Sequence, residues 1–166
     1  MNNITHHVGN LFNLYKEVGE ENNSTDSEVM NVIIHGCNAQ GRMGSGFAKE
    51  LRARFPGAYN EYKKQYESTG LQLGKNVYYL PHDENTLIVN AITQEYYGYD
   101  GKKYVSYDAI DDCMIELNTL LSGMDGNIQI HFPKIGADLG GGNWEVIKSI
   151  IETRVIFGTK HLYTLV

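Results

Sequence analysis

The stretch HGCNAQGRMGSGFAKELRARFPGAY, residues 35–59, decides how this chain can fold, because a glycine-rich turn in it joins two regular patterns. The residues up to that turn, MNVIIHG at 30–36, are apolar and β-branched, which is typical of a buried strand. After the turn, Phe47, Leu51 and Phe55 recur at helical spacing. A strand that runs through glycines into a helix places free backbone amides and the positive end of the helix at one edge of a sheet. The stretch therefore predicts a place where the backbone closely approaches a negatively charged group.

The same alternation of strand and helix continues along the chain. Further strands are predicted at residues 3–8, 76–80, 86–92, 127–132 and 161–166. Further helices are predicted after Pro56, after a capping Ser106 and from about Asn143. Alternating strands and helices favour an α/β fold with a mostly parallel sheet covered on both faces. We expect a single domain over residues 1–166, because this length suits one core.

Composition and charge narrow the possible partners. The chain is 42% hydrophobic and carries a net charge of −6, and it has no export signal or membrane-length apolar run. We expect a cytoplasmic protein with Cys37 and Cys113 reduced, and no membrane partner. We also expect no nucleic-acid polymer as a partner. Glutamates interleave the basic cluster, which is typical of a solvated helix face; the cluster consists of Lys49, Arg52, Arg54, Lys63 and Lys64.

A second glycine-rich segment, KIGADLGGGNW at 134–144, follows the predicted strand 127–132. Two strand-to-helix junctions at one edge of a sheet suit a diphosphate. Neither junction matches a common nucleotide motif: Gly46 is followed by Phe47 and Ala48 where a P-loop needs lysine, and GRMGSG is not GxGxxG. The alternative is that the glycines only make tight turns.

Four segments together resemble the macro domain family, whose members bind ADP-ribose. They are IIHGCNAQGRMGSGFAKELRARFPGAYNEY, AITQEYYG with YVSYDAI, PKIGADLGGGNWEVI and the terminal LYTLV. Within the family, the sequence is similar to the branch of the yeast-type ADP-ribose-1″-phosphate phosphatases and terminal ADP-ribose protein glycohydrolases. The resemblance implies a three-layer α/β/α sandwich with a mixed central sheet. It also implies ADP-ribose or ADP-ribose-1″-phosphate as the ligand.

The resemblance implies where each part of that ligand binds. Gly9, Asn10 and Leu11 match the adenine-recognition segment, with Asn10 in place of the usual aspartate. Asn38 matches the asparagine that bonds the distal ribose, although from the residues alone it could simply cap the turn. The first loop, around the distal ribose and phosphate, matches Gly44, Ser45, Gly46 and Phe47. The second loop, around the diphosphate, matches Ile135, Gly136, Ala137, Asp138, Leu139 and Gly140.

Two residues are candidates for chemistry. His35 ends an apolar strand at the expected rim and matches a histidine thought to be catalytic in the phosphatase branch, and histidine titrates where an acid or base is needed. Asp138 interrupts the second loop, where a nearby diphosphate would raise the pKa of its carboxyl group. Their alternatives are a packed, hydrogen-bonded histidine and a turn-stabilising aspartate. No cluster of ligands suggests a metal site, and we expect no cofactor.

The first hypothesis is therefore a metal-independent hydrolase that converts ADP-ribose-1″-phosphate to ADP-ribose and phosphate. The second is a module that binds ADP-ribose without turnover. The third, removal of ADP-ribose from modified proteins, is disfavoured because Gln94 and Gly140 stand where the glycohydrolase relatives carry lysine and aspartate. Gln94, Tyr96, Tyr97 and Tyr99 could still line the pocket, and Tyr163 could wall the adenine site.

Overall fold

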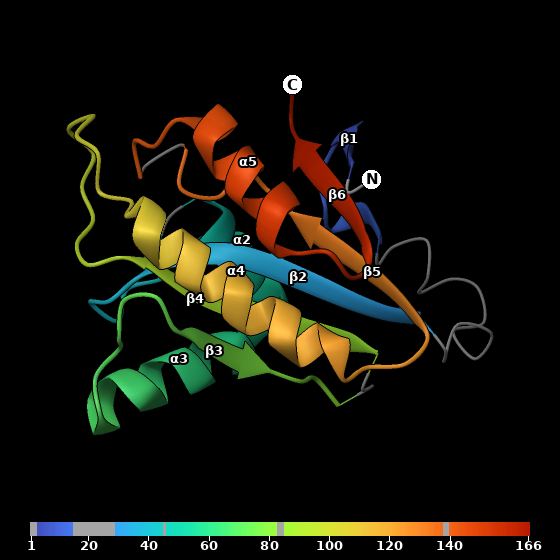
Figure 1. Cartoon of the computed structure of the whole chain (residues 1–166). Helices are drawn as coiled ribbons and strands as arrows, with labels where there is room; N and C mark the ends of the chain where they lie inside the picture. The colour runs from blue at the N-terminus through green and yellow to red at the C-terminus, as the bar shows by residue number, and fades with distance from the viewer. Residues whose placement is uncertain (1–2, 15–28, 45, 83–84, 138–139) are drawn as a thin grey trace.

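The computed structural model of the chain describes residues 3–14, 29–44, 46–82, 85–137 and 140–166. Its centre is a twisted sheet (Figure 1), ordered β1-β6-β5-β2-β4-β3. Neighbouring strands pair in parallel, except that β3 runs antiparallel to β4, so the sheet is mixed as expected. The strands are β1 (Ile4–Val8), β2 (Val29–Asn38), β3 (Asn76–Tyr79), β4 (Thr86–Gln94), β5 (Asn127–Phe132) and β6 (Thr159–Thr164).

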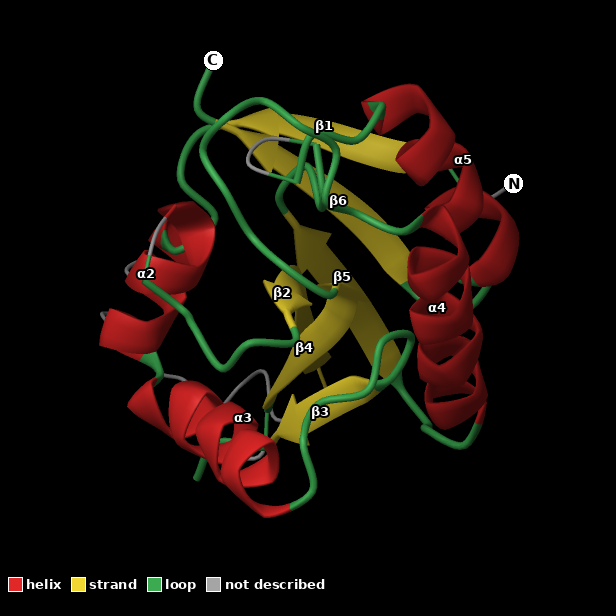
Figure 2. Ribbon diagram, turned by 90° about the vertical axis from the view of Figure 1, so that its left-hand side faces the viewer, coloured by secondary structure: helices red, strands yellow, loops and turns green. Residues whose placement is uncertain are grey.

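Helices cover both faces of this sheet, which confirms the three-layer α/β/α sandwich (Figure 2). One face carries α2 (Gly46–Arg54) and α3 (Pro56–Ser68), and the other carries α4 (Tyr107–Ser122) and α5 (Trp144–Arg154). The predicted caps are present: the Ser106 side chain accepts a hydrogen bond from the Ala109 amide, and Asn143 caps α5 through the Glu145 amide. Side-chain caps of this kind satisfy amides that a helix leaves free at its start.

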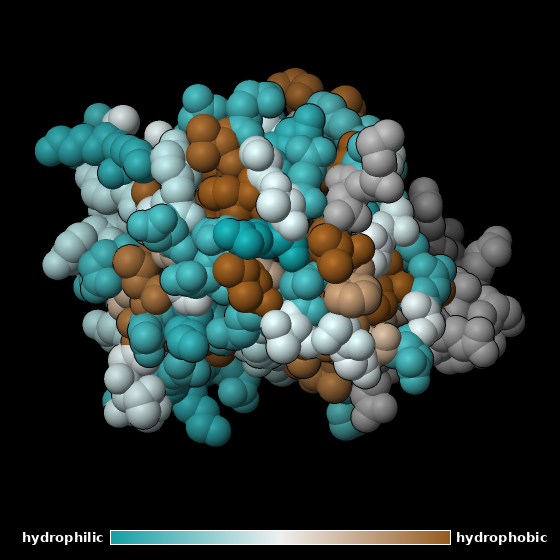
Figure 3. Space-filling model, in the orientation of Figure 1, coloured by the Kyte–Doolittle hydropathy of each residue, from teal (hydrophilic) through white to brown (hydrophobic). Residues whose placement is uncertain are grey.

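The larger part of the core lies under α4 and α5. The predicted apolar stripe of α4, from Ile110 to Leu121, is buried against alternate residues of the sheet such as Val32, Ile34 and Ile130. On the outer side of these helices, apolar side chains occur in separate patches among hydrophilic ones (Figure 3). Each helix therefore buries one stripe and exposes the other, as its pattern predicts.

The last strand is displaced from its predicted position. It spans Thr159–Thr164 rather than 161–166, because Thr159 and Lys160 already pair with Gln129 and Ile130 of β5. Lys160 lies inside the strand with its ammonium group donating to the Val155 carbonyl at 2.8 Å, which lets a lysine be buried there. A buried lysine in a strand gives no apolar signal, so the sequence pattern placed the strand two residues late.

Candidate functional site

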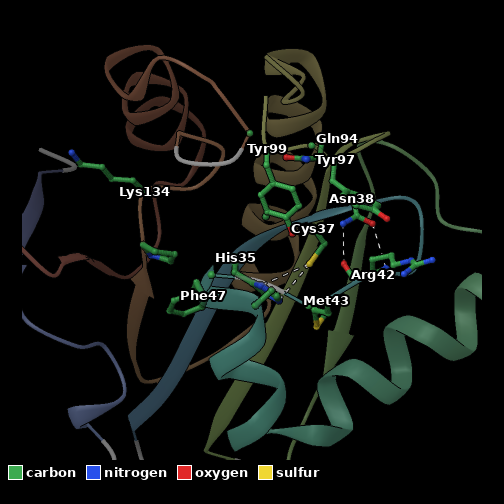
Figure 4. Close-up of a pocket in the computed structure, with 17 residues that line it drawn as sticks. His35, Cys37, Asn38, Arg42, Met43, Phe47, Gln94, Tyr97, Tyr99 and Lys134 are labelled. Atoms are coloured by element: carbon green, nitrogen blue, oxygen red, sulfur yellow. Dashed lines mark hydrogen bonds between the residues drawn. The ribbon is translucent and has the colours of Figure 1, made fainter. Parts of the chain in front are cut away.

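A cavity of about 290 Å³ lies at the carboxyl ends of the central strands, on the side of α2 (Figure 4). We call it the His35 hollow. Strand β2 supplies His35 to Asn38, the loop and start of α2 supply Gly44, Gly46 and Phe47, and Gln94 stands at the end of β4. The remaining lining residues are Arg42, Met43, Ala48, Tyr97, Gly98, Tyr99, Pro133, Lys134 and Gly140.

A second hollow of about 560 Å³ adjoins the first, and we call it the Asn10 hollow. It is walled by the segment after β1, residues 9–11, and by the chain end from Tyr163 to Val166. Gly46, Phe47, Pro133 and Lys134 line both hollows. The two hollows therefore form one elongated cleft, with the N-terminus of α2 at its middle.

Asn38 organises the loop between β2 and α2. Its side-chain oxygen accepts a hydrogen bond from the Gln40 amide at 3.0 Å, and its side-chain nitrogen donates to the Arg42 carbonyl at 2.8 Å. The Tyr62 hydroxyl donates to the backbone carbonyl of Asn38 at 2.6 Å. These contacts are those of the turn-capping alternative. One hydrogen of the amide nitrogen has no partner among the described contacts, so a bond from Asn38 to a ligand remains a prediction.

His35 is buried, with 1% of its surface exposed, and its hydrogen bond fixes its tautomer. Its Nε2 lies 2.5 Å from Oδ1 of Asn90, whose amide nitrogen donates to the Ala58 carbonyl at 3.1 Å. Because an amide oxygen only accepts, Nε2 carries the hydrogen and Nδ1 holds the lone pair. Burial lowers the pKa of His35 to about 4, although the bond to Asn90 opposes the shift. The expectation that it titrates near neutral pH is therefore wrong.

The sulfur of Cys37 lies 3.4 Å from Nε2 of His35 and also lines the cavity. Burial raises the pKa of this thiol well above its ordinary value, so it stays protonated. A protonated, buried thiol is no nucleophile. Cys37 therefore packs against His35 as a small buried side chain.

The second loop folds back on itself through close glycine contacts. The Gly142 amide donates to the Gly136 carbonyl at 2.8 Å, and a Cβ on Gly140 would lie 2.6 Å from that same carbonyl oxygen. The Gly140 carbonyl in turn accepts from the amides of Tyr104 and Val105. Glycine is needed at Gly140 for this approach, so at this loop the tight-turn alternative accounts for the pattern.

Among the described residues of the second-loop prediction, Gly140 alone lines the cavity. Ile135 is in the core under α5, and Gly136 and Ala137 line neither hollow. Ser45, Asp138 and Leu139 fall outside the described residues, so the expected pairing of Asp138 with His35 stays a prediction.

At the other end of the cleft, Asn10 is held by its neighbours. Its side-chain oxygen accepts from the Phe12 amide at 2.9 Å, and its nitrogen donates to Glu50 of α2 at 2.9 Å. The oxygen keeps a second lone pair for a donor from a ligand. Tyr163 faces the same hollow and donates its hydroxyl hydrogen to Nδ1 of His131 at 2.9 Å.

Sequence reasoning missed several lining residues. Arg42, Met43, Pro133 and Lys134 line the cleft but were not named as candidates. Pro133 and Lys134 directly follow β5, so their position at the strand end was the available signal. Tyr97 and Tyr99 do reach the cavity, with the Tyr99 ring directed into it (Figure 4), whereas Tyr96 does not line it.

Two negative findings hold for the part of the chain that the structure describes. No group of three or more histidine, cysteine, aspartate or glutamate side chains there could hold a metal ion. None of its helices has the length and apolar character needed to cross a membrane.

The geometry and the sequence together assign the family. The family model described as Macro domain matches residues 34–151, which include both loops of the cleft. The chain belongs to the macro domain family. The family that the sequence resembles is thereby confirmed. The elongated cleft lies where the two matched loops meet.

Relatives with similar sequences include a phage protein and yeast enzymes. A 17.5 kDa protein from the tk-vs intergenic region of Enterobacteria phage T4 is 34% identical over 124 residues, which cover 73% of this chain and 77% of that protein. The ADP-ribose 1″-phosphate phosphatase of Candida albicans is 24% identical over 125 residues, covering 73% and 80%.

Solved structures share the fold. The macrodomain of Thermus aquaticus DarG superposes with a TM-score of 0.70 at 20% identity, covering 96% of this chain and 95% of that one. Thermosipho africanus DarTG in complex with ADP-ribose superposes with a TM-score of 0.65 at 20% identity, covering 82% of this chain and 38% of that one.

Proposed function

We propose that the cleft binds ADP-ribose and that the protein hydrolyses ADP-ribose-1″-phosphate to ADP-ribose and phosphate. The observation that carries the binding proposal is the shape of the cleft, two hollows that meet at Gly46, Phe47, Pro133 and Lys134. ADP-ribose has the same plan, an adenosine and a distal ribose joined by a diphosphate. The chain's family, and a relative in complex with ADP-ribose, support the same ligand.

In this proposal each part of the ligand lies beside groups that can bind it. The adenine lies in the Asn10 hollow, where the free lone pair of Asn10 can accept from its exocyclic amine. The diphosphate lies at the N-terminus of α2, where the amides of the first turn and the helix dipole favour negative charge. The distal ribose and its 1″-phosphate then occupy the His35 hollow.

The phosphatase step is supported by His35 and by relatives named as ADP-ribose 1″-phosphate phosphatases. In this step water attacks phosphorus, the bond from phosphorus to the 1″-oxygen breaks, and the proton lost by water is balanced by one gained at that oxygen. The lone pair on Nδ1 of His35 can accept a hydrogen bond from the water. Its pKa of about 4 makes it a weak base, so it orients water more than it removes a proton. Asp138 is the proposed proton donor to the leaving oxygen.

A second candidate is binding without turnover. It is favoured by the burial and low pKa of His35, which are also the properties of a purely structural histidine. A third, removal of ADP-ribose from modified proteins, is disfavoured by Gln94. The Gln94 amide nitrogen is already committed to the Tyr96 carbonyl at 2.7 Å, and an amide cannot form a covalent adduct as a lysine can.

The test is phosphate release from ADP-ribose-1″-phosphate by the purified protein in EDTA. The variants are His35→Gln, Asp138→Asn and the control His82→Gln, an exposed histidine in the connection between β3 and β4, at the opposite edge of the sheet. Each variant is first titrated with ADP-ribose by calorimetry, so that loss of turnover is read only where binding persists.

The proposal predicts turnover by the wild type and the control, with a loss of about 100-fold for each of the other two variants. Tight ADP-ribose binding by a wild type that releases no phosphate would leave the binding candidate instead.

A further inference from the structure

A carboxylate lies in the Asn10 hollow beside Asn10 itself. Glu50 of α2 lines this hollow, and Oε1 of its carboxylate accepts a hydrogen bond from Nδ2 of Asn10 at 2.9 Å. Among the described residues that line the hollow, Glu50 is the one with an acidic side chain. The two bonded residues are 40 positions apart in sequence, so it is the fold that brings the carboxylate to this end of the cleft.

Helical spacing explains why Glu50 faces the hollow. Gly46 and Phe47 precede it on α2 by four and three positions, which places the three residues on one side of the helix. All three line the Asn10 hollow, whereas the neighbouring Lys49 and Arg52 line neither hollow of the cleft. The helix therefore presents its acidic side chain to the cleft and directs these basic ones elsewhere.

The Glu50 carboxylate keeps acceptor capacity for a ligand. A carboxylate can accept about four hydrogen bonds, and the contacts of the described residues give Glu50 one, from Asn10. The ion pairs in the described part of the chain involve other side chains. The bond from Asn10 therefore orients the carboxylate and leaves its charge in place.

The asparagine at residue 10 makes this arrangement possible. An aspartate is usual in the family segment that Asn10 matches, and here it would place a second carboxylate at hydrogen-bond distance from Glu50. Like charges at that distance repel each other. The amide of Asn10 donates to the carboxylate instead. The negative charge at this end of the cleft thus comes from α2 rather than from residue 10.

The exocyclic amine of adenine has two hydrogens to donate. In the proposed function, on which this inference rests, the free lone pair of Asn10 accepts one of them. The carboxylate oxygens of Glu50 lie next to that amide group and can accept the other. A hydrogen bond to a charged acceptor is stronger than one to a neutral acceptor, and a donor that loses its partner on binding weakens the complex.

We propose that Glu50 is a specificity-determining residue of the cleft, whose carboxylate accepts a hydrogen from the exocyclic amine of the base. It selects nucleotides whose base carries an amine at this position, as adenine does. The same charge sets the direction of the ligand, because a carboxylate repels phosphate and the N-terminus of α2 attracts it. The diphosphate then lies at the start of the helix, and the base lies beside Glu50.

The test is a thermodynamic cycle between residue and ligand, measured by calorimetry. The two ligands are ADP-ribose and an analogue in which hydrogen replaces the amino group of adenine. The test variant is Glu50→Gln, which keeps the size of the side chain and one acceptor oxygen but removes the charge. The control is Glu61→Gln, which makes the same change at an exposed glutamate of α3 that lines neither hollow.

We expect the preference for ADP-ribose over the analogue to fall about fivefold in Glu50→Gln. It should stay within about twofold of the wild-type value in Glu61→Gln. The ratio of the two affinities cancels any general effect of charge on the binding of an anionic ligand. A ratio in Glu50→Gln equal to that of the wild type would overturn the assignment.

A double variant tests whether the two side chains can exchange roles. Asn10→Asp/Glu50→Gln moves the carboxylate to residue 10, where the new amide on α2 can donate to it. We expect this variant to recover the preference of the wild type to within about twofold. A double variant that prefers ADP-ribose no more than Glu50→Gln does would contradict the proposed exchange of charge.

The same titrations separate this inference from the proposed function. A wild type that does not bind ADP-ribose would refute the proposed function and the role of Glu50 together. A wild type that binds ADP-ribose, with one ratio of affinities in every variant, would refute the role of Glu50 alone.

Discussion

The two faces of the sheet bury different chemistry. On the α4–α5 side, Val32, Ile34 and Ile130 meet apolar helix residues in a cluster without charge. On the α2–α3 side, buried apolar residues such as Ile33 and Ile88 are accompanied by the buried polar residues His35, Asn90 and His131. The cleft lies on the second side. Both faces therefore contribute apolar packing, and the second also places polar groups under the site.

Hydrogen bonds between side chains connect the polar groups of this face. His131 donates from Nε2 to Asn31 at 3.0 Å and accepts from Tyr163, and its ring stacks on that of His161 with centres 5.1 Å apart. His161 continues the array to His7 of β1 at 2.9 Å. Burial lowers the pKa of His131 and of His161, so acid destabilises this face.

The largest expected loss of stability comes from the apolar face. Leu117→Ala removes a fully buried side chain of α4, and we expect it to lower the free energy of unfolding by about 3 kcal/mol through lost transfer energy and a cavity. Urea denaturation measures the change. The control Leu120→Ala lies on the same helix at 38% exposure and should cost less than about 1 kcal/mol. Equal costs would show that the α4 stripe is not the main core.

Acid should weaken the polar face. Burial lowers the pKa of His35 to about 4 and that of His131 to about 3, from an ordinary 6.5. Between pH 6.5 and these lowered pKa values, the unfolded chain therefore binds protons that the folded protein does not. The contribution of these histidines to the free energy of unfolding is fully present above pH 6.5, and it decreases as the pH falls toward the pKa values of the folded protein. Each histidine contributes a slope of about 1.4 kcal/mol per pH unit at most.

Urea midpoints at pH values between 7 and 4.5, a span of about 2.5 units, measure this slope. His131→Gln should make the slope shallower, with the remainder due to His35 and His161, whereas the control His82→Gln changes a histidine at an exposed site. A slope that persists undiminished in His131→Gln would contradict the assignment to this face.

The hydrogen bonds of Asn90 should matter somewhat less. Asn90→Ala leaves the Nε2 hydrogen of His35 and the Ala58 carbonyl without partners, and we expect a cost of about 2 kcal/mol. A double-mutant cycle with His35→Ala isolates the pair. Additive effects would show that the two side chains do not interact, because contacting residues are expected to be coupled.

The smallest expected effect is again on the apolar face. Ser106→Ala removes the cap at the start of α4, in which the Ser106 hydroxyl accepts from the Ala109 amide at 3.1 Å, and should cost about 1 kcal/mol. Thermal unfolding measures it, and Ser106→Asp should retain most of the stability. If the aspartate variant were as unstable as the alanine variant, capping would not be the cause.

The sequence was sufficient to predict those elements that have a clear local signal. The stripe of α4, the caps at Ser106 and Asn143, and the glycine turn after β2 each follow from local chemistry, and the structure has all of them. The apolar run of β2 did not reveal that alternate residues face different environments, because both sides of a covered strand are buried.

The site was predicted less completely than the fold. Its glycines and His35 could be found from strand ends, but the low pKa of His35 comes from its burial in the folded protein, and its hydrogen-bond partner Asn90 lies 55 residues away in sequence. The position of Glu50 depends likewise on the fold, because its carboxylate accepts a hydrogen bond from Asn10, which lies 40 residues away in sequence. Such properties arise from tertiary contacts that a single sequence does not show.

The most direct test of the central claim is calorimetric titration of the purified protein with ADP-ribose and, in parallel, with ADP. In the proposed binding mode ADP-ribose occupies both hollows of the cleft, whereas ADP lacks the distal ribose that would fill the His35 hollow. We predict one site that binds ADP-ribose at least about tenfold more tightly than ADP. Equal affinities, or no ADP-ribose binding, would contradict the account.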